Sequence, residues 1–313
     1  MPTLSRRDFG LQLAAAATAS AALPAGAAET ATFKLGCITP NDAAGYTKFA
    51  QYLGRKPDLA VLYFNQSAPD ALWSSVPWLC NLAAGFIRQG AQVLWSVPCP
   101  GFRQHEAIVA GHWDSQYRNL FKSILAASPS GASDILVRLP WEFNLAQQEN
   151  AAFDKTGKFD AALFVQSFRH LADLAKSVSP RFRRIWCPNV CTNGIDPALC
   201  WPGAEFVEVV AQDFYLQKAW NKPGAFNWFL NEARGLNWGR DFAARQNRPY
   251  GLSEWGMDSD AFLADFKDAC TWLKALGPML DHHCWWDRPE VTDCRISDGT
   301  NPALAAEYRR QWG

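Results

Sequence analysis

The sequence carries little charge and no excess of either sign. Lys and Arg number 30, Asp and Glu also number 30, and charged residues make up 19% of the chain. Without a net positive field, the chain has no electrostatic preference for nucleic acid, and we expect none as a partner. Hydrophobic residues make up 49% of the 313 residues, which excludes a disordered chain and predicts a folded globular protein.

Long apolar runs and nucleotide-binding motifs are also missing. After residue 27 there is no run of 18 apolar residues, so we expect no membrane association once the N-terminal segment is removed. No G-x-G-x-x-G follows the first strand-like run, and no G-x-x-x-x-G-K-[ST] occurs. These glycine-rich loops hold the phosphates of nucleotides, so their absence argues against a nucleotide-binding fold. We predict no cofactor.

The first 27 residues have the features of an export signal. The sequence SRRDF at 5–9 precedes an uncharged, alanine-rich stretch at 10–23, and Ala25-Gly26-Ala27 supplies the small residues of a cleavage site. The apolar stretch is shorter than the roughly 20 residues that a membrane span needs. The paired arginines predict the twin-arginine type, with an ordinary secretory signal as the alternative. We therefore expect a bacterial protein that is periplasmic or secreted, with its folded domain at 28–313.

Nine cysteines are an odd number, so at least one stays unpaired within the chain. In an oxidising compartment, Cys191 with Cys200 and Cys284 with Cys294 could form disulfides, although sequence does not fix pairing. The alternative is a zinc site drawn from the Cys and His side chains of Cys187, Cys191, Cys200, His282 and His283. Their spacing fits no standard zinc template, and we predict no metal.

Eight strand-like runs alternate with helix-like segments. The runs are mostly continuously apolar, as expected for parallel strands buried on both faces, and they span 33–40, 59–65, 91–98, 134–141, 184–189, 206–215, 250–255 and 282–287. Helical periodicity marks 161–178 and 260–276, and more weakly 71–89, 115–126 and 302–310. Eight β/α units in about 280 residues predict a single-domain (β/α)8 TIM barrel. An open doubly wound sheet is the alternative.

Two glutamates follow predicted strands that lie on opposite sides of the barrel mouth. The fourth strand leads into RLPWEFN at 138–144, which contains Glu142, and the seventh leads into SEWG at 253–256, which contains Glu254. In such barrels the chemistry lies at the carboxyl ends of the strands. Two carboxyl groups that flank one bond are what glycoside cleavage requires, one to protonate the leaving oxygen and one to attack the sugar. A salt-bridged surface position is the alternative for each glutamate.

Five segments in this order resemble motifs of glycoside hydrolase family 26. They are AGHWD at 110–114, RLPWEFN at 138–144, WCPN at 186–189, WPG at 201–203 with DFY at 213–215, and SEWG at 253–256. The family belongs to a clan of barrels whose catalytic glutamates end strands four and seven. The resemblance implies a retaining glycosidase in which Glu142 is the general acid/base and Glu254 is the nucleophile. It also implies that Tyr215 donates a hydrogen bond to Glu254.

Neighbouring side chains are predicted to bind substrate or to support the two glutamates. Arg138 stands four residues before Glu142 on a predicted strand, so we expect it on the same side, where it would bind a carboxylate and hold Glu254 ionised. Asn144 would orient substrate or Glu142. The further predicted substrate contacts are Trp141, Asn189, Tyr215, Trp255, Trp285, Trp286 and Trp113. Packing in the core or at the barrel rim is the alternative for each tryptophan.

The chain departs from the family pattern at two places. Mannan-cleaving members usually have His where Trp141 stands, and Gly-x-Trp where Leu145-Ala146-Gln147 follows Asn144. The irregular stretch 145–158 is predicted to be a long active-site loop. We therefore predict an exported, monomeric, retaining endo-β-glycosidase that acts on a mannan, a glucan or a bacterial exopolysaccharide. A non-catalytic polysaccharide-binding barrel that serves an exopolysaccharide system is the alternative, and a metal-dependent barrel hydrolase or lyase is the third.

Overall fold

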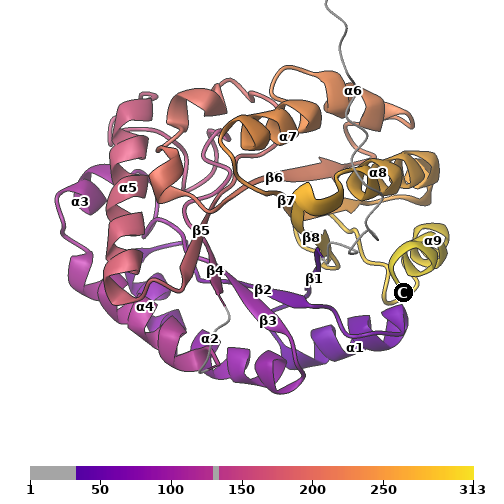
Figure 1. Cartoon of the computed structure of the whole chain (residues 1–313), viewed down its shortest axis with the longest axis horizontal. Helices are drawn as coiled ribbons and strands as arrows, with labels where there is room; N and C mark the ends of the chain where they lie inside the picture. Colours follow the sequence, from indigo (N-terminus) through magenta and orange to yellow (C-terminus); the bar gives the residue numbers. More distant parts are fainter. Residues whose placement is uncertain (1–32, 130–133) are drawn as a thin grey trace, which may run out of the picture. The chain divides into compact units, whose positions relative to one another are not determined.

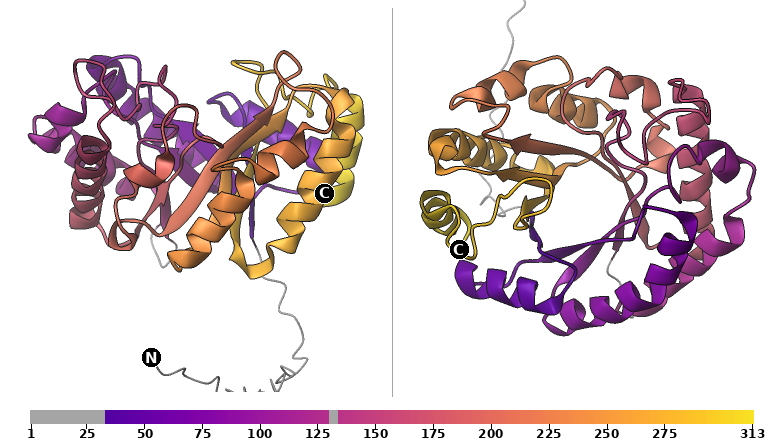
Figure 2. Two further views of the ribbon diagram at one scale, coloured as in Figure 1. Left: turned by 90° about the horizontal axis from the view of Figure 1, so that it is seen from above. Right: turned by 180° about the vertical axis from the view of Figure 1, so that it is seen from behind.

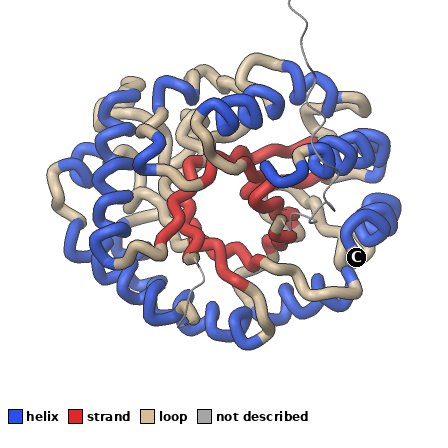
Figure 3. The backbone as a smooth tube through the Cα atoms, viewed as in Figure 1, coloured by secondary structure: helices blue, strands red, loops and turns tan. Residues whose placement is uncertain are grey.

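A computed structural model describes residues 33–129 and 134–313. At its centre, eight parallel strands form a closed barrel in which each strand pairs with the next and β8 pairs with β1 (Figures 1 and 3). The strands are β1 Lys34–Ile38, β2 Leu59–Tyr63, β3 Gln92–Ser96, β4 Ile135–Arg138, β5 Phe182–Trp186, β6 Val209–Leu216, β7 Tyr250–Met257 and β8 Leu280–Trp286. The predicted (β/α)8 barrel is confirmed, and the open-sheet alternative is wrong.

Helices surround this ring of strands, as the two further views of Figure 2 also show. The α-helices are α1 Ala43–Leu53, α2 Pro69–Arg88, α3 His105–Val109, α4 Asp114–Ala127, α5 Ala161–Val178, α6 Ala225–Asn231, α7 Leu236–Arg245, α8 Leu263–Ala275 and α9 Pro302–Trp312. Short 3-10 turns occupy Pro197–Cys200, Ala204–Phe206, Asp260–Phe262 and Gly277–Met279. The stretch 145–158 contains neither helix nor strand, as predicted.

Helix α1 shows why the sequence pattern missed some helices. Only three of its side chains, Tyr46, Phe49 and Leu53, are buried, so its apolar face is narrow. Its ends are nevertheless well specified. The Asp42 carboxylate accepts from the backbone N–H of Gly45 at 2.5 Å, and Gly54 closes the helix in the left-handed region at φ 84°. The caps therefore define a helix that hydrophobic periodicity alone does not reveal.

The strand register is irregular near the mouth of the barrel. Pairing between β6 and β7 shifts at Gln212/Asp213, and pairing between β7 and β8 shifts between Leu252 and Trp255. Beyond the first shift, Asp213 lies opposite Glu254. Bulges of this kind re-aim side chains and are common beside active sites. Because the strands are parallel, their carboxyl ends share one mouth, where Asp213 and Glu254 meet the residues that follow β4.

The predicted export signal at 1–27 lies outside the described residues, so it stays a prediction. Within the part of the chain that the structure describes, no helix is both long enough and apolar enough to cross a membrane.

Candidate active site

The carboxylate of Glu254, on β7, receives a donor on each oxygen. Nη2 of Arg138, at the end of β4, donates to Oε1 at 2.5 Å, and the hydroxyl of Tyr215, on β6, donates to Oε2 at 2.7 Å. The residue Glu254 is 5% exposed, and its partners come from different strands. The two contacts complement the negative charge of the carboxylate and fix its orientation.

Arg138 itself is fully buried and holds two carboxylates. Its Nη1 lies 3.1 and 3.0 Å from the two oxygens of Asp213, and its Nε and Nη2 donate to Ser96 Oγ at 3.2 and 2.9 Å. The indole of Trp141 covers the guanidinium, with its ring centroid 4.6 Å from the Arg138 Cζ. Arg138 therefore binds Glu254 as expected. Arg138 was also predicted to contact substrate, but its complete burial leaves it only the role of positioning this carboxylate.

Glu142 reaches the mouth from a turn, because β4 ends four residues earlier, at Arg138. Its backbone is left-handed at φ 49°, and its N–H donates to the carbonyl oxygen of Cys187 at 2.8 Å. The expectation that Arg138 and Glu142 share one strand is wrong. A non-glycine residue in this backbone region costs free energy and persists where its surroundings hold it, as they do at many functional sites.

The carboxyl group of Glu142 is buried between two amides. Asn189 Nδ2 donates to Oε1 at 2.7 Å, and Gln148 Nε2 donates to Oε2 at 2.8 Å. Burial, followed by the charge of Glu254, raises the pKa of Glu142 from 4.5 to about 7, while the hydrogen bond from Asn189 and the charge of Arg138 oppose the rise. A carboxyl group that is still partly protonated near neutral pH is suited to donate a proton.

Asn144 supports Glu142 through Asn189. Its side chain is fully buried, accepts from the Asn189 backbone N–H at 2.9 Å, and donates to the carbonyl oxygens of Asn189 and Cys191 at 2.9 and 2.8 Å. These bonds fix the segment from which the Asn189 amide reaches Glu142. Asn144 therefore orients Glu142, one of its two predicted roles, and is too deeply buried to contact substrate, which was the other.

Glu142 and Glu254 line one cavity of about 310 Å³ at the barrel mouth. Four of the predicted substrate contacts line it with them: Trp141, Asn189, Tyr215 and Trp286. Leu145, Gln147 and Gln148 come from the predicted active-site loop, and Tyr63, Gln66 and Gln217 are further lining residues. The structure thus brings the two predicted catalytic glutamates together in a pocket with aromatic and amide walls.

Three predicted tryptophan contacts need correction. Trp255 and Trp285 are 0% exposed, lie perpendicular to each other with centroids 4.8 Å apart, and pack on Phe266 of α8. Successive strand side chains point to opposite faces, so Trp255 faces the helices because Glu254 faces the barrel mouth. The same alternation separates Trp285 from Trp286. Trp113 packs 5.9 Å from Trp73 of α2, outside the pocket lining.

The thiols form no crosslink in this structure. All nine cysteines lie within the described residues and are free, so neither Cys191 with Cys200 nor Cys284 with Cys294 is bonded. Cys187 instead donates from Sγ to Asp213 Oδ1 at 3.2 Å. In residues 33–129 and 134–313, no group of three or more His, Cys, Asp or Glu side chains is arranged to hold a metal ion.

Sequence reasoning missed three polar residues of the site. Asp213 balances Arg138, and it stood within the quoted DFY motif without being assigned a role. Gln148 comes from an irregular loop, where no sequence pattern marks it. Tyr63 ends β2, and its buried hydroxyl lies beside the carboxylate of Glu254. Burial, followed by the charge of Glu254, raises the pKa of Tyr63 well above its ordinary value.

Solved structures share the barrel fold of this chain, whereas family models and curated sequences do not match its sequence. No protein-family model matches the chain, and no curated protein sequence matches it. Among solved structures, the catalytic domain of the GH26 endo-β-1,4-mannanase from Bacillus sp. JAMB-750 has a TM-score of 0.69 at 11% identity, covering 91% of this chain and 87% of that one. GH26C from Muricauda sp. MAR_2010_75 has 0.65 at 14%, covering 90% and 85%. The GH26 β-mannanase BoMan26A from Bacteroides ovatus has 0.60 at 13%, covering 91% and 89%. The fold resemblance to family 26 is thereby confirmed.

Proposed function

We propose that this chain is a glycoside hydrolase that cleaves a β-linked polysaccharide with retention of anomeric configuration. The observation that carries the proposal is the contrast between two glutamates in one pocket. Glu142 is shielded between two neutral amides with its pKa raised to about 7, whereas Glu254 is held by a buried arginine and a phenol. Such unequal environments separate a proton donor from a nucleophile.

The reaction proceeds in two displacements. In the first, a Glu254 oxygen forms a bond to the anomeric carbon while the bond to the leaving oxygen breaks and Glu142 delivers its proton to that oxygen. In the second, Glu142 accepts a proton from water, whose oxygen attacks the same carbon and releases Glu254. Arg138 and Tyr215 keep the attacking carboxylate in place through both steps. Asn189 and Gln148 keep the Glu142 side chain in position as it loses and regains its proton.

The substrate is proposed from the pocket and from the neighbours together. Two of the structural neighbours named above are described as mannanases, which makes β-1,4-mannan the first polymer to test. Trp141 stands where mannan-cleaving relatives usually have His, and its ring packs against the guanidinium of Arg138. β-Glucans, xylans and bacterial exopolysaccharides therefore belong in the same panel, with product sizes distinguishing endo from exo cleavage.

The stereochemical experiment tests the assigned roles. Fresh products are followed by proton NMR, and retention predicts that the β-anomer appears first. With added azide, Glu142→Ala is expected to release a glycosyl azide of retained configuration, because azide replaces water on the glycosyl-enzyme. Glu254→Ala is expected to release the inverted azide, because azide replaces the nucleophile. Binding of a polymer without cleavage of any would instead favour the polysaccharide-binding barrel.

Export forms the second part of the proposal. The arginine pair and cleavage site in residues 1–27 support transport of the folded domain to the periplasm or beyond. There a monomeric hydrolase would meet an extracellular polysaccharide directly.

A further inference from the structure

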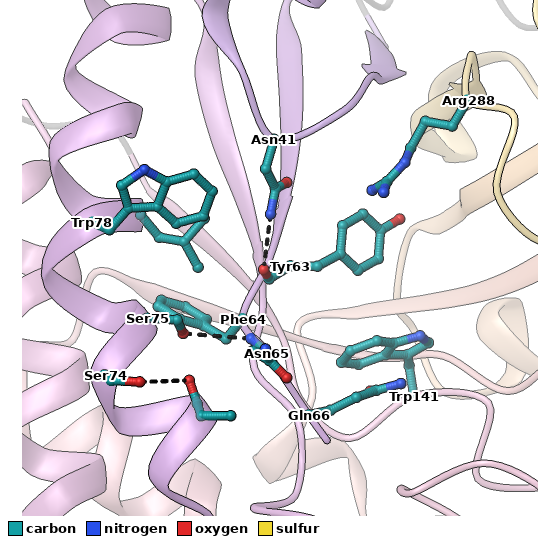
Figure 4. A pocket seen from close by; sticks show the side chains of 12 residues that line it. Asn41, Tyr63, Phe64, Asn65, Gln66, Ser74, Ser75, Trp78, Trp141 and Arg288 are labelled. Carbon is teal, nitrogen blue, oxygen red and sulfur yellow. Dashed lines mark hydrogen bonds between the residues drawn. The ribbon is translucent and has the colours of Figure 1, made fainter. Parts of the chain in front are cut away.

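A second cavity adjoins the pocket that holds the two glutamates. Its volume is about 620 Å³, and it shares Tyr63, Gln66 and Trp141 with that pocket. Its remaining lining comes from the β1–α1 connection, the end of β2, helix α2 and the segment after β8 (Figure 4). A polysaccharide whose scissile bond lies at Glu142 and Glu254 would extend past Tyr63 and Trp141 into this second cavity.

One buried polar atom in its wall lacks a partner. Asn41 Nδ2 donates to the carbonyl oxygen of Tyr63 at 3.2 Å, which leaves Asn41 Oδ1 buried with no donor from the described part of the protein (Figure 4). The Tyr63 hydroxyl, by contrast, lies beside the Glu254 carboxylate and belongs to the pocket that holds the two glutamates. Buried polar groups are nearly always paired in folded proteins, so the unpaired Asn41 oxygen is suited to accept a hydrogen bond from a ligand. A sugar hydroxyl group supplies the missing hydrogen bond.

Arg288 gives this cavity a positive charge. Of the described residues that line it, Arg288 alone is charged. Its Nε donates to Glu290 Oε2 at 3.0 Å, and neither Nη atom has a hydrogen-bond partner in the described ranges. Its Cζ lies 5.2 Å from the Trp286 ring centroid and 6.0 Å from that of Tyr63, so two aromatic rings support the guanidinium. Figure 4 shows this end of Arg288 directed toward Tyr63 and Asn41.

The ion pair with Glu290 does not cancel this charge. The side chain of Glu290 is 52% exposed and that of Arg288 is 19% exposed, so the carboxylate is screened by solvent while the guanidinium is largely enclosed. Across the cavity, Trp78 of α2 is 54% exposed and offers an apolar ring face. One wall is thus suited to the face of a pyranose ring and the other to an anionic group.

We propose that this cavity binds a sugar residue that carries a carboxylate, so that the natural substrate is an acidic polysaccharide. The inference rests on the proposed function, because it places the acidic sugar beside the residue whose bond is cleaved. The planar fork of Arg288 presents two free Nη groups, which matches a carboxylate better than it matches a single hydroxyl. Asn41 binds a hydroxyl group of the same sugar or of the next one.

The test measures binding in the Glu142→Gln protein, which cannot complete the reaction. Isothermal titration compares two matched pairs of β-1,4-linked tetrasaccharides, oligomannuronate against mannotetraose and oligoglucuronate against cellotetraose. The members of each pair differ only in the C6 carboxylate. We expect at least one acidic member to bind about tenfold or more tightly than its neutral partner, and added salt to weaken that preference.

Further substitutions in the Glu142→Gln protein test whether Arg288 causes the preference for the acidic tetrasaccharide. Arg288→Gln is expected to abolish the preference, and Arg288→Lys to retain part of it. Glu290→Gln is expected to strengthen binding of the acidic member, because it releases the Nε edge of Arg288. Arg240→Gln, which removes an arginine from an ion pair with Asp241 on α7 away from both cavities, is the matched control and is expected to change nothing.

The outcomes separate this inference from the proposed hydrolase activity. Equal binding of both members of each pair, no binding by any tetrasaccharide, or a preference that survives Arg288→Gln would overturn the acidic-sugar site. Cleavage of a neutral polymer together with equal binding would leave the hydrolase and remove the inference. Arg288-dependent binding of an acidic oligomer, with no cleavage of any polymer by the unaltered protein, would keep the site and remove the hydrolase.

Discussion

Replacing Glu142 by Gln is expected to stabilise the folded protein at alkaline pH. Burial, and then the charge of Glu254, raises the pKa of Glu142 from 4.5 to about 7, so the folded state resists ionisation that the unfolded state allows. At about 1.4 kcal/mol for each pKa unit, a difference of about 2.5 corresponds to about 3 kcal/mol. The free energy of unfolding falls by this amount when the pH rises far enough to ionise the buried carboxyl group of Glu142.

The pH window follows from the direction of this shift. Below pH 4.5 the carboxyl group is protonated in both states, and its contribution to stability is fully present. Between pH 4.5 and about 7 it ionises in the unfolded chain first, so stability falls, and above about 7 the loss is complete. A glutamine cannot ionise and is spared this loss. It still accepts from Asn189, and the Gln148 amide can turn to accept from its new NH2 group.

Urea unfolding at pH 5 and at pH 8 measures the effect. We expect Glu142→Gln to raise the free energy of unfolding by about 3 kcal/mol at pH 8 and by less than about 1 kcal/mol at pH 5. Glu106→Gln, which removes only an exposed pair with Lys155, should change it by less than about 0.5 kcal/mol at either pH. Glu254→Gln should lower stability at both values, because Arg138 loses a charged partner. An equal effect of Glu142→Gln at both pH values would refute the raised pKa and remove the basis for its acid role.

Four further outcomes are expected. Tyr215→Phe removes the donor to Glu254 Oε2 and should lower kcat by about 10- to 100-fold with little change in unfolding midpoint; an unchanged kcat would contradict the positioning role. The rate should fall above about pH 7 as the acid glutamate loses the proton it must donate, which a pH–kcat profile checks. Thiol titration of unreduced, denatured protein should find nine thiols, and fewer would reveal a disulfide. Replacing Arg6 and Arg7 by Lys should leave unprocessed precursor in the cytoplasm, as immunoblotting of cell fractions would show.

The strand pattern predicted the barrel because its strands are buried on both faces. Continuous apolar runs such as 59–65 and 91–98 contain β2 and β3, and the helix expected at 161–178 coincides with α5. The run at 134–141 was too long because Leu139 to Trp141 remain apolar after the ladder ends at Arg138. Burial continues through this turn, so hydrophobicity does not mark the end of the strand.

The meeting of Glu142 and Glu254 in one pocket could be predicted, and their surroundings only in part. The two glutamates follow two strand ends in a fold whose chemistry has a fixed location. Gln148 could not be found, because its contact with Glu142 depends on the path of an irregular loop. Sequence alone did not show which of Trp285 and Trp286 faces the pocket. Successive side chains of a strand point to opposite faces, so an error of one residue in the strand alignment reverses the answer.

Trp141 stands where mannan-cleaving members of the family usually have His, and its position links it to substrate choice in this pocket. Burial and the charge of Glu254 raise the pKa of Glu142, while Asn189 and Arg138 lower it. Trp141 covers Arg138 and lines both cavities, so it lies at the junction between the two glutamates and the wall that carries Arg288. A change at this position can therefore alter which sugar passes between the cavities while Glu142 and Glu254 keep their hydrogen-bond partners, which come from other residues. If the proposed function holds, the departure from the family pattern at Trp141 therefore concerns the polymer that is bound and not the two glutamates.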